Sequence, residues 1–230
     1  DASGRPTVVA GVPPDYFSAT GQRWGNPLYR WDVMAQDGYS WWLSRIRATL
    51  ALVDIIKIDH FRGFDAYWEV PASEPTAIHG RWVKAPGEDF FNVVENALGK
   101  LPIIVEDLGV ITPTVEALRD GFHLQGMKVL QFAWEDYTGQ EPFLPNNSSP
   151  TWVVYTVTHD IKTTRGWWID EATPVMRGHL RQYIDRMPTE INWELIRLGE
   201  ASVGHTFITP IQDLLGLDGE SRMNLPGRES

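Results

Sequence analysis

Three acidic residues, Asp59, Glu106 and Asp160, follow three short apolar and β-branched-rich runs of the sequence. One such acid is commonly a helix cap or a salt-bridge partner, but three at equivalent positions favour a shared site. Clustered carboxylates repel one another, so their pKa values separate. One can then stay ionised as a nucleophile while another keeps a proton as a general acid. Glycosyl transfer with retention of configuration needs that division of roles.

A metal site is the competing use of these acids, because His60 and His159 could ligate zinc or manganese. The zinc spacings H-x-x-x-H and H-E-x-x-H are absent, so no metal is expected. Nucleotide-binding and serine-hydrolase motifs are also absent, and without cysteine no thiolate chemistry is available. The sequence therefore predicts a site that works with no cofactor.

Alternating apolar runs and amphipathic stretches predict an α/β fold with a parallel sheet. The expected strands are Thr7–Val12, Val53–Ile58, Pro102–Val105, Met127–Phe132, Trp152–Thr156 and Ala201–Ile208. The expected helices are Tyr39–Leu52, Phe90–Leu98, one that begins at Thr112-Pro113, Pro174–Arg186 and Pro188–Leu198. The acids come at the carboxyl ends of the strands, where α/β barrels and open α/β sheets build their sites.

The composition excludes several partners. The 230 residues carry 20 basic and 30 acidic side chains, a net charge of -10, so nucleic acid and anionic membranes are not expected partners. No transmembrane run or signal peptide is seen, and we expect a cytoplasmic protein. Eleven tryptophans, several beside polar residues and turns, suit a groove that binds neutral sugars.

Five segments resemble those of amylomaltases, the 4-α-glucanotransferase or disproportionating-enzyme family, in its C-terminal catalytic half. They are Gly11–Tyr29 with Pro13-Pro14-Asp15-Tyr16-Phe17, Ile58-Asp59-His60-Phe61-Arg62-Gly63-Phe64, Ile104-Val105-Glu106-Asp107-Leu108-Gly109, Thr158-His159-Asp160, and Gln212–Leu217 with Arg222–Gly227. They are ordered and spread over nearly the whole chain, so chance agreement is negligible.

The resemblance implies transfer of α-1,4-glucan segments between maltooligosaccharides by retaining double displacement. Asp59 would be the nucleophile, Glu106 the acid and base, and Asp160 the group that holds the hydroxyls of the cleaved sugar. Further substrate-binding positions follow from the matched motifs: Asp15, Tyr16, Phe17, Trp24, Lys57, His60, Phe132, His159 and Asn224. A lid at about residues 11–30 would shield the intermediate from water.

The resemblance also implies a (β/α)8 barrel, and here the chain departs from the family. Family members are roughly twice as long, so we expect a single partial barrel domain, residues 1–230, that starts near the end of the third strand. The N-terminal half of the barrel is then an expected partner. An incomplete barrel would expose strand edges.

Two further departures concern the site. Lys57 stands where the family has arginine two residues before the nucleophile, and a point charge orients a carboxylate less firmly than a bidentate fork. Val157, Ile161 and Lys162 replace glycine, asparagine and aspartate around the third acid. A glucan-binding fragment with impaired catalysis is therefore the alternative, and a hydrolysing glycosidase is a weaker one.

Overall fold

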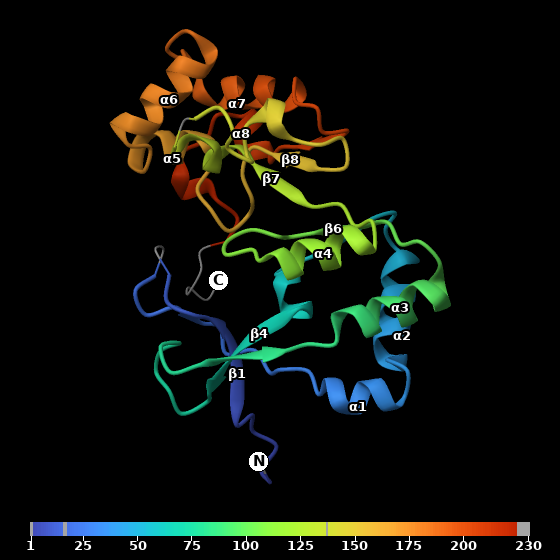
Figure 1. The fold of residues 1–230 in the computed structure, drawn as a ribbon. Coiled ribbons are helices and arrows are strands. Elements are labelled where there is room, and N and C mark those ends of the chain that lie inside the picture. The colour runs from blue at the N-terminus through green and yellow to red at the C-terminus, as the bar shows by residue number, and fades with distance from the viewer. Residues whose placement is uncertain (1, 16–17, 137, 225–230) are drawn as a thin grey trace. The chain divides into compact units, whose positions relative to one another are not determined.

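The computed structural model describes residues 2–15, 18–136 and 138–224 and contains two compact units (Figure 1). The first unit comprises residues 1–124 and the second comprises residues 125–230. Each unit has its own sheets and its own hydrophobic core. The expectation of a single domain over residues 1–230 stays a prediction.

An antiparallel sheet opens the first unit. Its strands, in the order β2-β1-β4-β5, are β1 (Val8–Val12), β2 (Gln22–Arg23), β4 (Ala66–Pro71) and β5 (Arg81–Lys84). The run Thr7–Val12 is thus a strand, but its assignment to the parallel sheet is wrong. Val9 and Gly11 are buried while their neighbours are half-buried, an alternation typical of an antiparallel strand with one covered face.

The parallel pair of the first unit is β3 (Ile56–Ile58) with β6 (Ile103–Val105), in the register Ile56 to Ile103 and Ile58 to Val105. The predicted strand Val53–Ile58 is shorter than expected because Val53 and Ile55 are exposed. The helices of this unit are α1 (Trp31–Gln36), α2 (Ser40–Leu50), α3 (Gly87–Leu98) and α4 (Pro113–Gly121), with a 3-10 turn η1 (Phe61–Phe64). Helix α1 was not predicted.

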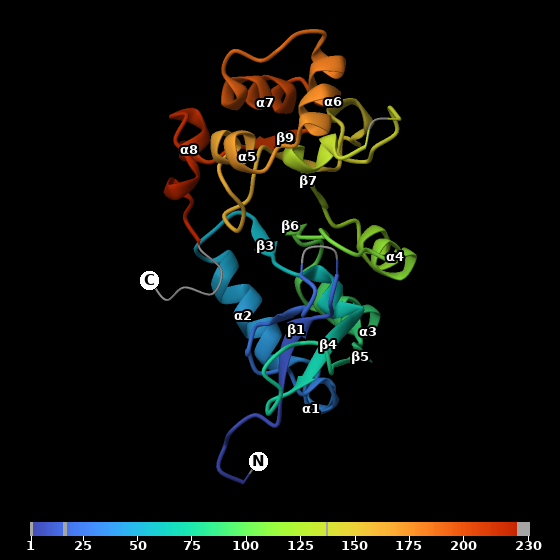
Figure 2. The same ribbon diagram turned by 90° about the vertical axis from the view of Figure 1, so that its left-hand side faces the viewer.

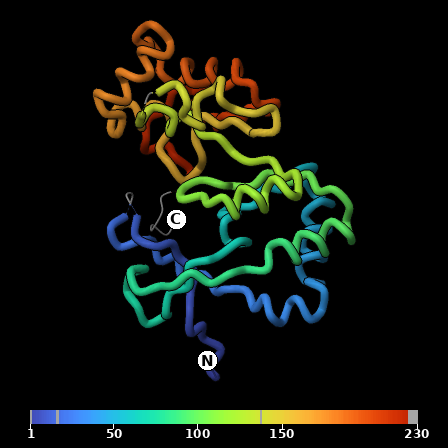
Figure 3. The backbone as a smooth tube through the Cα atoms, in the orientation of Figure 1, coloured from blue at the N-terminus to red at the C-terminus, as the bar shows by residue number. Residues whose placement is uncertain are grey.

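Aromatic side chains fill the core of the first unit, to which α2, α3, η1 and β6 contribute and in which α2 contacts α3; Figure 3 traces the backbone of these elements. Phe61 and Phe90 are almost fully buried there, and Trp31 stacks on Trp42 with ring centroids 6.3 Å apart. Several tryptophans considered for a sugar groove are therefore core residues, whereas Trp24 and Trp41 stay exposed.

The second unit holds a parallel sheet with helices packed on it (Figure 2). Its strands are β7 (Met127–Val129), β8 (Val153–Tyr155) and β9 (Thr206–Ile208). Its helices are α5 (Thr164–Asp170), α6 (Pro174–Ile184), α7 (Ile191–Glu200) and α8 (Ile211–Leu214). Short 3-10 turns are η2 (Leu130–Trp134), η3 (Pro145–Asn147) and η4 (Gly219–Ser221).

From residue 53 onward, parallel strands occur among helices, as expected for an α/β fold. Each predicted strand in this part of the chain contains an observed strand. The predicted strand Met127–Phe132 ends at Val129, where η2 begins, and Ala201–Ile208 contains a strand only at its end. Within the described residues the strands form sheets of four, two and three members, and none of these sheets closes on itself.

A buried ion pair stabilises the segment that follows β6. The guanidinium of Arg119 on α4 donates to the carboxylate of Asp107 at 2.6 Å, and the two side chains are 9% and 1% exposed. Because both side chains are shielded from water, the pair compensates charges that hydration does not, and Arg119 pairs in addition with Asp120 at 2.8 Å.

We expect Arg119→Met to lower the free energy of unfolding by about 3 kcal/mol, because the Asp107 carboxylate would stay buried without its cation. Urea denaturation followed by circular dichroism measures the change. The control is Arg30→Met, which breaks the exposed pair between Arg30 and Asp32 and should leave the midpoint unaltered. Equal midpoints for both variants would contradict the assigned role of Arg119.

Candidate active site

The register of β3 and β6 brings Asp59 and Glu106 to the same edge of the sheet. Ile58 pairs with Val105, so the next residue on each strand is one of the two predicted acids. The amide of Glu106 donates to the carbonyl of Ile58 at 2.8 Å, which carries the parallel ladder up to the acid itself. The two acids therefore lie at the carboxyl ends of neighbouring parallel strands, as the sequence predicts.

The Glu106 carboxylate is held by two backbone N–H groups. The amide of His60 donates to Oε2 and the amide of Leu108 donates to Oε1, each at 2.8 Å. His60 adopts a left-handed backbone conformation with φ 49°, which is uncommon for a non-glycine residue and frequent at functional sites. One oxygen is thus bound from the β3 side and the other from the β6 side.

Burial raises the pKa of Glu106, and the negative charge of Asp59 acts in the same direction. The two backbone hydrogen bonds and the Lys57 ammonium oppose that rise. A carboxyl group with a raised pKa can keep a proton for longer as the pH rises, as a general acid must.

Asp59 has the opposite environment. Its side chain is 61% exposed and forms an ion pair with Lys57, which lies two residues earlier and therefore on the same face of the strand. Lys57, which stands where the family has arginine, therefore contacts the predicted nucleophile.

His60 and Trp24 pack together beside this pair. Their rings meet edge to face with centroids 4.7 Å apart at 88°. Burial lowers the pKa of His60 to about 4, and the charge of Arg62 contributes in the same direction. The imidazole is therefore neutral at neutral pH. Its Nε2 is buried and has no hydrogen-bond partner among the described residues.

The predicted lid segment is anchored to β1. The amide of Trp24 donates to the carbonyl of Ala10 at 3.1 Å, and the Trp24 indole N–H donates to Gln22 Oε1 at 3.2 Å. Asp15 accepts from the amide of Ser18 at 2.8 Å. Gly21 has φ +65°, and a Cβ there would lie 2.4 Å from the carbonyl oxygen of Val12, so the turn requires glycine. Tyr16 and Phe17 lie outside the described residues.

In the second unit, Asp160 and two predicted binding residues come together. Asn224 Nδ2 donates to Asp160 Oδ1 at 2.6 Å, and His159 Nε2 lies 3.3 Å from Oδ2. The amide of Asn224 also donates to the carbonyl of His159 at 3.3 Å. The Asp160 side chain is 48% exposed, so these contacts orient a carboxylate that solvent and ligands can reach.

Asp213 is a positioning residue that sequence reasoning did not single out. It is fully buried and accepts from the amide and the hydroxyl of Thr164, at 2.8 and 2.7 Å. Because Thr164 begins α5, this carboxylate fixes the segment that follows Asp160 and lies at a helix N-terminus. The sequence marks Asp213 as a member of the Gln212–Leu217 motif. Its contact with Thr164 could not be predicted, because the two residues lie 49 positions apart.

The departures around Asp160 are accommodated locally. Val157 is buried, and the Lys162 ammonium pairs with Asp170 at 2.7 Å and with Glu171 at 3.5 Å. Phe132 is half-buried in η2 and meets Phe143 edge to face at 5.7 Å. Its predicted role in lining the groove stays a prediction.

Residues 2–15, 18–136 and 138–224 contain no group of three histidine, aspartate or glutamate side chains arranged to hold a metal ion. Across the same ranges, no helix is long and apolar enough to cross a membrane.

Comparison with known proteins identifies close relatives. A family model described as 4-alpha-glucanotransferase matches residues 2–230. The chain is 56% identical over 239 residues to the 4-alpha-glucanotransferase of Thermus thermophilus, covering 100% of this chain and 47% of the relative. It is 47% identical over 227 residues to the chloroplastic/amyloplastic 4-alpha-glucanotransferase of Solanum tuberosum, covering 98% of this chain and 39% of that protein.

A solved structure is similar as well. The amylomaltase of Streptococcus agalactiae, in complex with acarbose, matches with a TM-score of 0.93 and 39% sequence identity, over 98% of this chain and 46% of that one. The chain spans about half the length of the curated relatives that it matches.

We expect Lys57→Met to raise the pKa of Glu106 further, because the variant removes a cation that favours the ionised carboxylate. A ¹³C NMR titration of the Glu106 carboxyl measures the shift directly. The matched control is Lys100→Met, which removes an exposed lysine after α3 and should leave the Glu106 titration unchanged. A Glu106 pKa that falls in Lys57→Met would contradict the electrostatic account of the site.

Proposed function

Because the chain belongs to the 4-alpha-glucanotransferase family, we propose that it transfers α-1,4-glucan segments between maltooligosaccharides by retaining double displacement. The observation that carries the proposal is the contrast between two acids at neighbouring strand ends. Asp59 is exposed and paired with a cation, whereas Glu106 is half-buried and its pKa is raised. Retaining enzymes need one ionised and one protonated carboxyl at the scissile bond.

In the first step, the Asp59 carboxylate attacks the anomeric carbon of the donor glucan while the bond to the leaving oxygen breaks. Glu106 gives its proton to that oxygen, so the shortened glucan leaves with a free 4-hydroxyl and a β-glycosyl ester forms on Asp59. In the second step, Glu106 takes the proton of an acceptor 4-hydroxyl, whose oxygen attacks the same carbon and releases Asp59.

The Asp160 cluster serves the sugar that is cleaved. A carboxylate fixed by Asn224 and His159 can accept hydrogen bonds from two neighbouring hydroxyls, and these bonds strengthen as the ring flattens in the transition state. Asp213 supports this group by fixing the start of α5. We assign Asp160 to substrate binding and Asp213 to positioning.

Transfer in place of hydrolysis requires that water be kept from the ester on Asp59. We assign that task to the lid at about residues 11–30, whose Trp24 contacts His60 directly after the nucleophile. Asp15, Tyr16 and Phe17 would form its tip. A neutral His60 suits this position, since a buried imidazolium would compete with Lys57 for the charge of Asp59.

We also infer that the strands β3, β6, β7, β8 and β9 belong to a (β/α)8 barrel which chain segments outside these 230 residues complete. Two observations support this inference: the strands form parallel sheets that do not close, and the chain spans about half of its relatives. The N-terminal half of the barrel would then be the partner that covers the open strand edges.

We expect the chain to convert maltotriose into glucose and a ladder of longer maltooligosaccharides. Asp59→Asn should lower the turnover number by at least about 10³-fold, because an amide cannot form the glycosyl ester. Thin-layer or anion-exchange chromatography of the products measures both. The matched control is Asp54→Asn, an exposed aspartate just before β3, which should keep the ladder.

A ladder that persists in Asp59→Asn would refute the assignment of the nucleophile. Glucose and maltose without longer products would indicate a hydrolase whose lid closes poorly. Unchanged maltotriose would instead support the glucan-binding fragment with impaired catalysis.

A further inference from the structure

Arg62 lies three residues after the predicted nucleophile, and its guanidinium joins two other segments of the first unit. Its Nη1 donates to the carbonyl of Val110 at 2.6 Å, 48 residues further along the chain. Its Cζ lies 4.1 Å from the centroid of the Trp82 ring on β5, which is a cation–π contact. The side chain therefore connects η1 with β5 and with the loop that follows Glu106.

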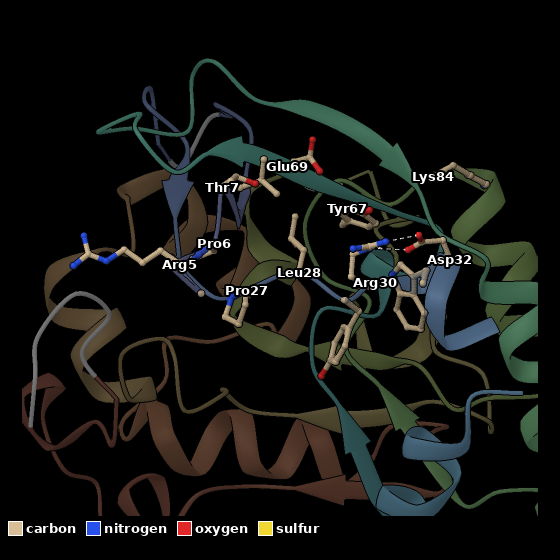
Figure 4. A pocket seen from close by; sticks show the side chains of 14 residues that line it. Arg5, Pro6, Thr7, Pro27, Leu28, Arg30, Asp32, Tyr67, Glu69 and Lys84 are labelled. Atoms are coloured by element: carbon tan, nitrogen blue, oxygen red, sulfur yellow. Dashed lines mark hydrogen bonds and ion pairs between the residues drawn. The ribbon is translucent and has the colours of Figure 1, made fainter. Parts of the chain in front are cut away.

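The Trp82 ring under the guanidinium is held in place by β4. Trp82 pairs with Trp68 across the two strands, and their rings meet edge to face with centroids 5.3 Å apart. Tyr67 and Glu69 of β4 line a pocket of about 650 Å³ (Figure 4). Because side chains alternate along a strand, Trp68 and Trp82 lie on the opposite face of this sheet. Arg62 thus rests on a ring whose position the sheet determines.

The surroundings of Arg62 are unfavourable for a cation that serves only to fill space. Its Nε is buried and has no hydrogen-bond partner among the described residues. Burial lowers the pKa of Arg62, and the charge of Asp65 offsets that effect only in part. Keeping a half-buried cation costs free energy, and an apolar side chain could fill the same space without that cost. The contacts of the guanidinium therefore point to a role beyond packing.

The loop that Arg62 contacts contains one of the two donors to the Glu106 carboxylate. Leu108, two residues before Val110, donates its amide to Glu106 Oε1 at 2.8 Å. Gly109 lies between them with φ +81°, a left-handed conformation that turns the chain. The hydrogen bond from Arg62 to the Val110 carbonyl therefore restrains the turn that presents the Leu108 amide.

We propose that Arg62 is a positioning residue for glucan transfer. Its bond to Val110 and its stacking on Trp82 form a clamp that keeps the Leu108 amide on the Glu106 carboxylate. A guanidinium suits this task, because its planar group can stack on a ring and donate in a fixed direction at the same time, which an ammonium cannot do. The proposal rests on the proposed function for the reaction, but the clamp can be measured without substrate.

Two neighbouring groups respond to Arg62 in different ways. Burial lowers the pKa of His60 to about 4, and the charge of Arg62 contributes in the same direction, so His60 reports on that charge. Burial raises the pKa of Glu106, and the hydrogen bond from the Leu108 amide opposes that rise, so Glu106 reports on the clamp. Charge and clamp can therefore be separated in one protein.

The test compares Arg62→Met and Arg62→Lys with the unaltered chain in ¹³C NMR titrations of the Glu106 carboxyl and the His60 imidazole. Arg62→Met removes both the charge and the clamp, so the pKa of each group should rise. Arg62→Lys keeps the charge but loses the stacked, directed donor, so the pKa of Glu106 should rise while that of His60 stays low. Arg47→Met, at an exposed arginine on α2, is the matched control and should move neither.

The same variants are compared in the disproportionation of maltotriose. Arg62→Lys should lower the turnover number by about tenfold and leave KM within about twofold, because the residue holds Glu106 and not the sugar. Initial rates of glucose release measure both quantities. Arg47→Met should leave both unchanged.

Trp82→Leu is the second variant if residue 62 does not tolerate a change, since Trp82 is 40% exposed and its replacement leaves the core intact. It removes the ring under the guanidinium and should also raise the pKa of Glu106. Trp193→Leu, at an exposed tryptophan on α7, is its matched control and should leave the Glu106 titration unchanged.

An unchanged Glu106 titration in folded Arg62→Met would overturn the clamp, even if turnover falls. A Glu106 pKa that rises in Arg62→Met and returns in Arg62→Lys, as that of His60 should, would overturn it as well, because charge alone would then explain the effect. The expected Glu106 shifts without a product ladder from the unaltered chain would count against the proposed function and leave the clamp standing.

Discussion

The carboxylate of Glu106 is the point on which the candidate active site depends. It receives one hydrogen bond from the chain that leaves β3 and one from the chain that leaves β6, through the amides of His60 and Leu108. The parallel register alone would bring Asp59 and Glu106 to the same edge, and these two bonds fix where the Glu106 carboxyl points. The left-handed turn at His60 is the backbone conformation in which its amide reaches across.

The same arrangement gives two chemically similar acids different surroundings. Burial penalises the charge on Glu106, and its two N–H donors only partly offset that penalty, so the pKa is raised. Asp59 lies one register step away with its side chain mostly in solvent and a lysine beside it. Depth below the surface thus distinguishes the two carboxyl groups, as the proposed roles of acid and nucleophile require. Lys57 acts on both acids. It pairs with Asp59, and its charge opposes the rise in the pKa of Glu106.

Sequence reasoning succeeded where local pattern determines structure. Ile103–Val105 is a continuous β-branched run, and all three residues are buried in the strand that precedes Glu106. The sequence did not predict strands whose formation depends on pairing with residues far away in the chain. Strand β5 reads Arg-Trp-Val-Lys and is held by pairing with β4, including a Trp68–Trp82 contact at 5.3 Å that no local pattern indicates. The antiparallel pairing of β1 is likewise a property of its neighbours.

The site shows the same limit. Asp59, Glu106 and Asp160 could be found because acids at strand ends form a recognisable pattern, but the groups that orient them come from far along the chain. Asn224 lies 64 residues from Asp160, and Asp213 lies 49 residues from Thr164. Lys162 shows why a substitution read in isolation can mislead. It reverses a charge beside the third acid, yet α5 and the residue that follows it supply Asp170 and Glu171 to pair with it. The reversed charge is thus balanced by acids other than Asp160, and the carboxylate of Asp160 keeps Asn224 and His159 as its partners.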